Sequence, residues 1–165
     1  MRNYSEIKVT RDGERCTISF DRTEALNAIT PTMLEELNAA ATAASEDDSI
    51  RFVVLTGEGR SFSAGVDLKA LGERKLVNGK VGDILDLPAR RLTSTLSSMP
   101  KITIARVNGF CFTGALELAI SCDLFVVASN AKLGDTHAKF GLRPTWGLSQ
   151  RLPELVGLAK ARELS

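Results

Sequence analysis

The chain has 165 residues, a length typical of one domain with a buried core. Its 21 Lys and Arg residues against 20 Asp and Glu residues give a net charge of +1 at pH 7, which excludes an overall field that attracts nucleic acid or acidic lipid. No apolar run is long enough to span a membrane, and residues 1–6 lack the apolar core of a secretory signal. We therefore expect one soluble, cytoplasmic domain, residues 1–165, with neither nucleic acid nor membrane as a partner.

The first third of the chain predicts two strands and a helix. Apolar and polar residues alternate from 14 to 20, and the turn residues at 11–14 favour a hairpin with another strand at about 6–10. Thr30 and Pro31 then supply a helix N-cap and a first-turn proline. The apolar residues that follow have helical spacing and predict an amphipathic helix: Met33, Leu34, Leu37, Ala40, Ala41 and Ala44.

Three short apolar runs, at 52–55, 102–107 and 124–128, predict parallel strands that are covered on both faces. Helical patterns lie between these runs, at about 114–121 and at about 83–98, where four residues are expected to point inward: Ile84, Leu85, Leu92 and Leu96. This alternation of strands and helices favours an α/β fold with right-handed crossovers.

Two other stretches and the cysteines complete the expectations about structure. Residues 72–81 carry glycine and charge without periodicity and predict a mobile loop. Residues 146–165 have a helical pattern that ends without a cap or a proline. The cysteines lack paired spacing and stand among apolar neighbours, which predicts buried free thiols and no metal site: Cys16, Cys111 and Cys122.

Two segments, residues 61–69 and 108–118, each follow a predicted strand and cross small residues into a helical pattern. Such turns expose backbone N–H groups, and two of them facing one another could hold a developing oxyanion. Glu117 lies three residues after Gly114 in an apolar stretch. A buried carboxylate is costly unless it has a partner, and burial tends to raise its pKa into a range useful for acid/base chemistry. These features predict a site for an acyl group.

Other chemistries have partial support. Residues 56–62 resemble a dinucleotide loop, but Phe62 replaces the third glycine. A nucleotide hydrolase is excluded, because residues 115–116 are not the Lys and Ser or Thr of a phosphate loop. Ser63 stands in a near-match to a nucleophile elbow with His137 downstream, which leaves a serine hydrolase as an alternative. His137 is the only histidine, and a lone histidine is more often a structural side chain than a catalytic one. Asp135 could orient it if the backbone turns there.

Four blocks in order resemble the crotonase family, whose best-known members are enoyl-CoA hydratases and isomerases: residues 22–28, 62–69, 105–117 and 144–152. The resemblance covers essentially the whole chain and implies a crotonase-like spiral of ββα units within the α/β class. It also implies that the thioester of an acyl-CoA substrate is held by the N–H groups of Val66 and Gly114, beside Glu117 as acid/base, without a cofactor. The residues implied to border the substrate are Ala25, Ala64, Val66, Asp67, Leu68, Lys69 and Gly114.

The chain departs from the family pattern in three places, one of which is residues 113–115, where Thr113 and Ala115 flank Gly114 and the family often has three glycines. His137 occupies the position of the second catalytic glutamate, where it could share proton transfer with Glu117. Family chains also usually continue into C-terminal helices that cover the acyl pocket and build trimers, so we expect that this part is missing and that a homotrimer or a dimer of trimers forms where it is present. The expected reaction is hydration of a trans-2-enoyl-CoA, with double-bond isomerisation or non-catalytic acyl-CoA binding as alternatives.

Overall fold

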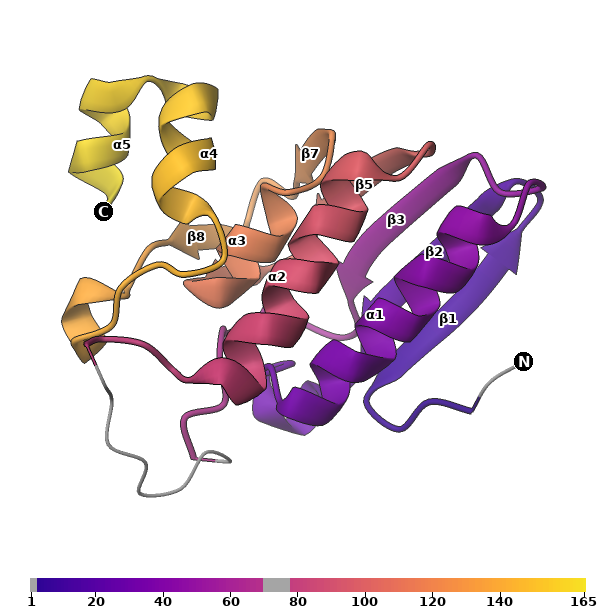
Figure 1. The fold of residues 1–165 in the computed structure, drawn as a ribbon, viewed down its shortest axis with the longest axis horizontal. Coiled ribbons are helices and arrows are strands. Elements are labelled where there is room, and N and C mark those ends of the chain that lie inside the picture. The colour runs from indigo at the N-terminus through magenta and orange to yellow at the C-terminus, as the bar shows by residue number, and fades with distance from the viewer. Residues whose placement is uncertain (1–2, 70–77) are drawn as a thin grey trace.

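The computed structural model describes residues 3–69 and 78–165, and its largest element is a five-stranded sheet (Figure 1). The strands lie in the order β1 (Ile7–Asp12), β2 (Arg15–Phe20), β3 (Phe52–Gly57), β5 (Ile102–Val107) and β7 (Leu124–Val127). β1 and β2 form the predicted antiparallel hairpin, and each later neighbour is parallel. The α/β class predicted from the alternation of elements is confirmed.

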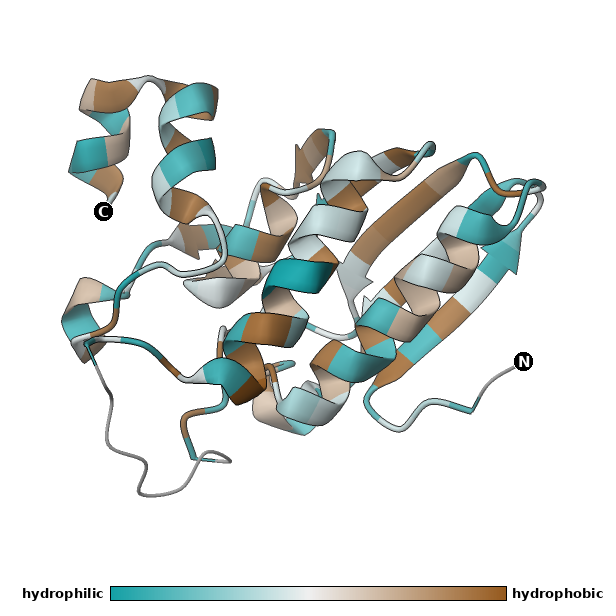
Figure 2. Cartoon of the chain, in the orientation of Figure 1, coloured by the Kyte–Doolittle hydropathy of each residue, from teal (hydrophilic) through white to brown (hydrophobic). Residues whose placement is uncertain are grey.

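Two long helices cover one face of this sheet, α1 (Pro31–Glu46) and α2 (Asp83–Ser98), and they lie side by side (Figure 1). The predicted start of α1 is confirmed, because the Thr30 side chain accepts a hydrogen bond from the Met33 amide at 3.0 Å and Pro31 is the first helical residue. Figure 2 shows hydrophilic residues on parts of the outward faces of both helices, hydrophobic patches at the first turns of α2, and a hydrophobic strand β3 beneath the helices.

A second, smaller sheet lies at the ends of the parallel strands. Its strands are β4 (Ser61–Ser63), β6 (Phe110–Phe112) and β8 (Lys132–Gly134), and neighbouring strands are parallel. The short helix α3 (Gly114–Ala119) follows β6 at once, and 3-10 turns occupy Thr23–Ala25 and Ala138–Phe140. Sequence patterns did not predict this sheet, because strands of three residues are too short to show alternation.

Several local predictions were wrong. Ile84 is 44% exposed, because the inward face of α2 carries Leu85, Leu92 and Leu96, and Ile84 lies about a quarter turn from it. Residues 68–69 form a turn, and the rest of the helix expected after Gly65 lies outside the described residues, as does most of the loop expected at 72–81. The helical pattern at 146–165 is two helices, α4 (Leu148–Val156) and α5 (Leu158–Leu164), broken at Gly157.

The strand β7 was expected to be covered on both faces, and that was wrong as well. All four of its residues are exposed, with Leu124 at 51% and Val126 at 55%. β7 is the last strand of its sheet, and α1 and α2 lie over the others (Figure 1). Apolar composition predicted the strand correctly, but it cannot report whether another layer reaches that strand.

The cysteines are free thiols, as predicted, with Cys16 and Cys111 buried and Cys122 half-buried. Burial raises the pKa of Cys111 and of Cys122 to about 12. No helix in the described part of the chain is long and apolar enough to cross a membrane.

Candidate active site

The small sheet brings the two predicted turns together, since β4 and β6 are adjacent parallel strands and each ends in one of the turns. Gly65 has a φ of +93°, and a β-carbon there would lie 2.9 Å from the backbone oxygen of Phe112. A glycine is required for both reasons, the left-handed backbone and the close approach. The chain segments around Gly65 and Phe112 therefore pack directly against each other.

This arrangement leaves the amides of Val66 and Gly114 outside the local hydrogen-bond ladders. The bridge between Ile29 and Val66 uses the Ile29 amide, which donates to the Gly65 oxygen at 2.8 Å, and the Asp67 amide, which donates to the Ile29 oxygen at 2.9 Å. Gly114 is the first residue of α3, where an amide has no acceptor within its own helix. The amides of Val66 and Gly114 are thus both available as donors, and the turns that carry them pack against each other.

The block at 22–28 supports the first turn through two side chains. Asn27 is completely buried, and its Nδ2 donates to the backbone oxygens of Glu58 and Ser61 at 2.9 and 2.8 Å. Arg22 donates to the Ala28 oxygen and forms an ion pair with Asp67 at 3.1 Å. These contacts fix the position of the 64–67 segment relative to the rest of the core.

Glu117 is buried at 1% exposure, and its carboxylate is held by main-chain donors. The amides of Trp146 and Leu148 both donate to Oε1, each at 3.0 Å. The other oxygen, Oε2, lies 3.4 Å from Nε2 of His137. One oxygen is therefore anchored by backbone amides, while the second faces the imidazole.

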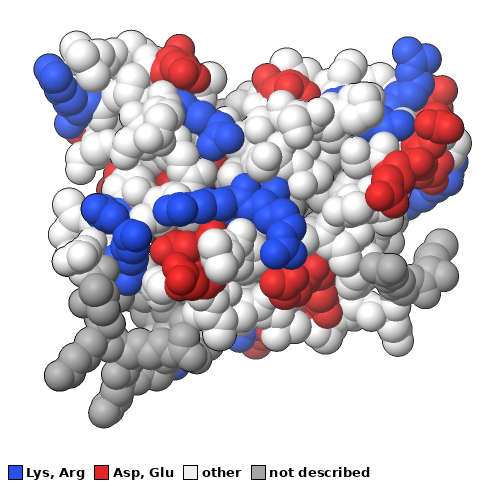
Figure 3. Space-filling model, viewed as in Figure 1, with Lys and Arg blue, Asp and Glu red and all other residues white. Residues whose placement is uncertain are grey.

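The segment that carries these donors is itself held from both sides. In α2, the buried Asp86 accepts hydrogen bonds from Thr145 Oγ1 at 2.7 Å and from Trp146 Nε1 at 2.8 Å. Arg90 of α2 donates to the Thr145 oxygen, and Arg151 of α4 donates to the Trp146 oxygen. Figure 3 shows Lys and Arg side chains in a row across the face where α2 meets the segment leading into α4. The amides that hold Glu117 are thereby kept in place.

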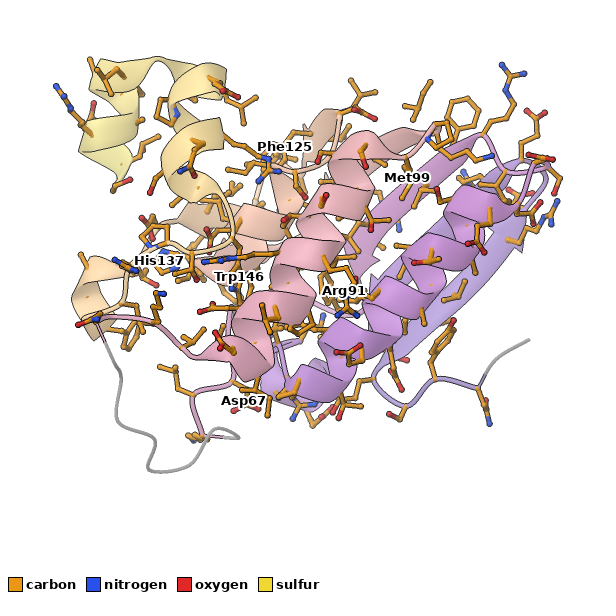
Figure 4. All side chains as sticks on the ribbon, in the orientation of Figure 1. Asp67, Arg91, Met99, Phe125, His137 and Trp146 are labelled. Carbon is orange, nitrogen blue, oxygen red and sulfur yellow. The ribbon has the colours of Figure 1, made fainter. Side chains whose placement is uncertain are left out.

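His137 lies between two carboxylates, near Trp146 in Figure 4. Its Nδ1 is 2.5 Å from Oδ1 of Asp135, and the same oxygen accepts a hydrogen bond from the His137 backbone amide at 2.9 Å. Burial by itself lowers the pKa of the imidazole, but the hydrogen bonds and charges of Asp135 and Glu117 outweigh burial and raise the pKa to about 9. At neutral pH the ring is consequently an imidazolium.

The predicted site residues thus fall into groups. Glu117 and His137 are in contact, and the turns of Val66 and Gly114 pack together. Ala64 donates its amide to the Leu26 oxygen, beside the half-buried Ala25. Leu68 and Lys69 are exposed next to this turn, and Asp67 pairs with Arg22.

The geometry disfavours the serine hydrolase. Ser63 is buried, and its Oγ accepts a hydrogen bond from the Gly65 amide at 3.2 Å. Both ring nitrogens of His137 face carboxylates, whereas a nucleophilic serine needs a histidine nitrogen within hydrogen-bond reach.

No group of three or more His, Cys, Asp or Glu side chains is arranged for a metal ion in residues 3–69 and 78–165. A groove of about 740 Å³ beside β1 and α1 is lined by none of the predicted site residues.

Sequence reasoning missed Asp86 and Trp146. Asp86 falls on the apolar face of α2 together with Leu85 and Ala89, and a carboxylate at such a position was the available signal. Trp146 lies in the block at 144–152 that carries the family resemblance, but its contact with Glu117 could not be predicted, because it comes from the backbone amide.

The sequence and the fold of this chain match those of a known class of proteins. The family model described as enoyl-CoA hydratase/isomerase matches residues 11–165, and the chain belongs to this family. Among individual relatives, the chain is 39% identical over 163 residues to a probable peroxisomal enoyl-CoA hydratase of Arabidopsis thaliana, covering 99% of this chain and 59% of that protein. It is 34% identical to the crotonyl-CoA hydratase of Syntrophomonas wolfei, covering 98% of this chain and 61% of the relative.

Solved structures agree with the sequence comparison. An enoyl-CoA hydratase subunit from Geobacillus kaustophilus superposes with a TM-score of 0.86 at 32% identity, over 98% of this chain and 61% of that one. An enoyl-CoA hydratase from Bacillus anthracis gives a TM-score of 0.85 at 31% identity, over 97% and 62% of the two chains. The expected crotonase-like fold is confirmed, and the chain spans about three-fifths of the length of these relatives.

Proposed function

We propose that this chain carries the reaction centre of an enoyl-CoA hydratase, which adds water across the double bond of a trans-2-enoyl-CoA. The observation that carries the proposal is the setting of Glu117: its carboxylate is 1% exposed, Oε1 is held by two backbone amides, and Oε2 lies 3.4 Å from Nε2 of His137. A fixed carboxylate of this kind is suited to accept a proton from water. The hydratase names of its relatives support the same reaction.

In this proposal the amides of Val66 and Gly114 bind the thioester oxygen of the substrate. As water attacks the β-carbon, the electrons of the double bond move toward the carbonyl and negative charge develops on that oxygen. Each such donor typically stabilises a transition state by about 3–4 kcal/mol. Donors fixed in the protein before the reaction are effective because they need no reorganisation.

The proton transfers are divided between the two side chains. Glu117 takes a proton from the attacking water, and His137 gives its Nε2 proton to the α-carbon. The electron pair of the former double bond becomes the new C–H bond, and the water oxygen forms the C–O bond. The proton on Glu117 then returns to His137 across the 3.4 Å contact, which restores the starting state. The net change is the addition of one water molecule.

The remaining contacts of the substrate are assigned to the rim of the first turn. Ala25, Ala64, Asp67, Leu68 and Lys69 would border the CoA moiety, with the exposed Lys69 available to a phosphate. The homotrimer and the cytoplasmic location expected from the sequence stay predictions.

The test is hydration of a short trans-2-enoyl-CoA by the purified 165-residue chain, followed through loss of the ultraviolet absorbance of the conjugated thioester. Glu117→Gln should lower kcat by about 10²–10⁴, since it keeps the shape but removes the base. Acyl-CoA affinity, measured by calorimetry, should change little. Glu154→Gln on the exposed surface of α4 serves as the matched control and should retain wild-type rates.

Three results would contradict the proposal. Binding without turnover in the wild-type chain would favour the non-catalytic alternative. Conversion of a 3-enoyl-CoA without water in the product would favour the isomerase. Release of free CoA that depends on Ser63 would favour the hydrolase.

A further inference from the structure

Asp135 is the residue from which a further role can be inferred. Its side chain is only 3% exposed, and a single oxygen, Oδ1, binds both the backbone amide and the Nδ1 of His137. A side-chain oxygen that accepts from the amide two residues ahead forms a tight local turn. The contact is therefore built into the segment that follows β8, and it brings the imidazole back onto the carboxylate.

This contact decides which way the ring faces. With Nδ1 bound to Asp135, the opposite nitrogen, Nε2, is directed at Oε2 of Glu117, at 3.4 Å. The two carboxylates come from different parts of the fold, because Asp135 follows β8 whereas Glu117 lies in α3. When a carboxylate binds one ring nitrogen of a histidine, that bond sets the orientation of the ring and the protonation of the other nitrogen.

We propose that Asp135 is a positioning residue that holds His137 in its charged form, with Nε2–H directed at Glu117 and at the reacting carbon. The role in the reaction rests on the proposed function, whereas the control of the orientation and charge of His137 does not. By the resemblance in sequence, His137 stands where the family has its second catalytic glutamate, so the family pattern does not supply this role.

The charges around the ring support this role. His137 is 6% exposed, and burial alone favours the neutral imidazole. A residue that gives a proton to carbon must instead be held in its charged form. Asp135 and Glu117 are the carboxylates that contact the ring, and the hydrogen bond to Asp135 is the largest favourable contribution to its pKa. In turn, the pKa of Asp135 is lowered by its bonds to His137, with a further contribution from the Ser165 hydroxyl, despite burial that raises it.

The chain offers a direct readout, because His137 is its only histidine. Nitrogen-15 and proton spectra of the imidazole, recorded across a pH series, report its protonation without any need for turnover. In the wild-type chain both ring nitrogens should stay protonated at pH 7 to 8. A ring that titrates near the ordinary value of 6.5 would overturn the proposal without any variant.

Asp135→Asn separates charge from shape, since the amide oxygen can still accept from the His137 backbone and from Nδ1. The imidazole pKa should fall by about one unit or more, which is a tenfold change in protonation equilibrium. The exposed Asp48→Asn removes the same charge elsewhere and should leave the pKa of His137 unchanged. Equal titration of wild type and Asp135→Asn would overturn the proposal.

Kinetics then separate this proposal from the proposed function. In Asp135→Asn, kcat should fall about 10–100-fold with little change in KM, and the alkaline limb of the pH profile should move down together with the imidazole pKa. A pH profile that stays in place while the imidazole pKa moves would overturn the role in the reaction. A shifted pKa in a chain without any hydratase activity would overturn the proposed function and leave the control of His137 by Asp135 standing.

Discussion

The indole of Trp146 lies directly against Gly114, so that a β-carbon on residue 114 would come within 2.5 Å of the ring atom Cζ3. The same tryptophan donates its backbone amide to Glu117 and its Nε1 to Asp86. One residue therefore links the start of α3, the anchored carboxylate and the long helix α2. The glycine turn and the carboxylate site are parts of one packed unit.

Gly114→Ala should lower the free energy of unfolding by about 1–3 kcal/mol, because the new methyl group overlaps the buried indole. Chemical denaturation of both proteins measures the difference. The double variant with Trp146→Leu is the control, since removal of the ring should make the combined loss smaller than the sum of the single losses. Strictly additive losses would show that another group excludes the side chain.

Asp86→Ala should destabilise the chain by about 2–4 kcal/mol, since Thr145 Oγ1 and Trp146 Nε1 would both lose a buried acceptor. Asp83→Ala changes an exposed carboxylate in the same helix and should cost less than about 1 kcal/mol. Thermal or chemical unfolding distinguishes the two. Similar losses in both variants would mean that only the helix dipole is involved.

Asn27→Ala should also be strongly destabilising, by about 3 kcal/mol or more, because the Arg22 amide and the Glu58 oxygen lose a partner and the Ser61 oxygen keeps only the longer contact to Asn108. Asn27 also has a φ of +56°, which alanine tolerates poorly. Asn27→Gly removes the side chain without this strain and should therefore cost about 1 kcal/mol less than alanine. An alanine variant as stable as the glycine variant would contradict the backbone part of the argument.

Stability should fall as the pH rises from about 6.5 to about 9. The pKa of His137 is raised in the folded chain to about 9, so the folded state keeps a proton that the unfolded state loses near 6.5. The stabilisation is complete below pH 6.5 and is lost as the pH passes 9. Denaturation at a series of pH values measures the slope.

His137→Gln is the control for that slope, which should vanish between pH 6.5 and 8 in this variant. Above about pH 8.5 both proteins should still lose stability, because Cys111 and Cys122 ionise more easily when unfolded than in the core. An unchanged slope below pH 8 in the variant would show that His137 is not its source.

Elements with local determinants could be predicted from the sequence. The cap and proline at 30–31 fixed the start of α1, and the spacing of Leu85, Leu92 and Leu96 gave the buried face of α2. The strands of the small sheet could not be predicted, since each is defined by a partner rather than by its own pattern. The exposure of β7 likewise depends on what lies over the strand, and hydropathy carries no record of that.

The candidate site shows the same division. Glu117 stood out because it interrupts an apolar helix, and the glycines marked the turns. The partners of Glu117 could not be found, because they are backbone amides contributed by residues about 30 positions later. The pairing of His137 with Asp135 depended on a turn that a spacing of two residues leaves open, and the structure contains that turn.

The anchoring of Glu117 by the main chain determines which sequence changes the site tolerates. Every amino acid except proline carries a backbone N–H, so replacing the side chain at position 146 or 148 removes no donor, although the Trp146 side chain also helps to hold its segment through Asp86. Natural variation at these two positions can therefore change the side chains around the carboxylate while both hydrogen bonds to it are kept. Proline is the single substitution that would delete a donor outright, and its exclusion from both positions in functional variants is the signature that this form of anchoring leaves in a sequence.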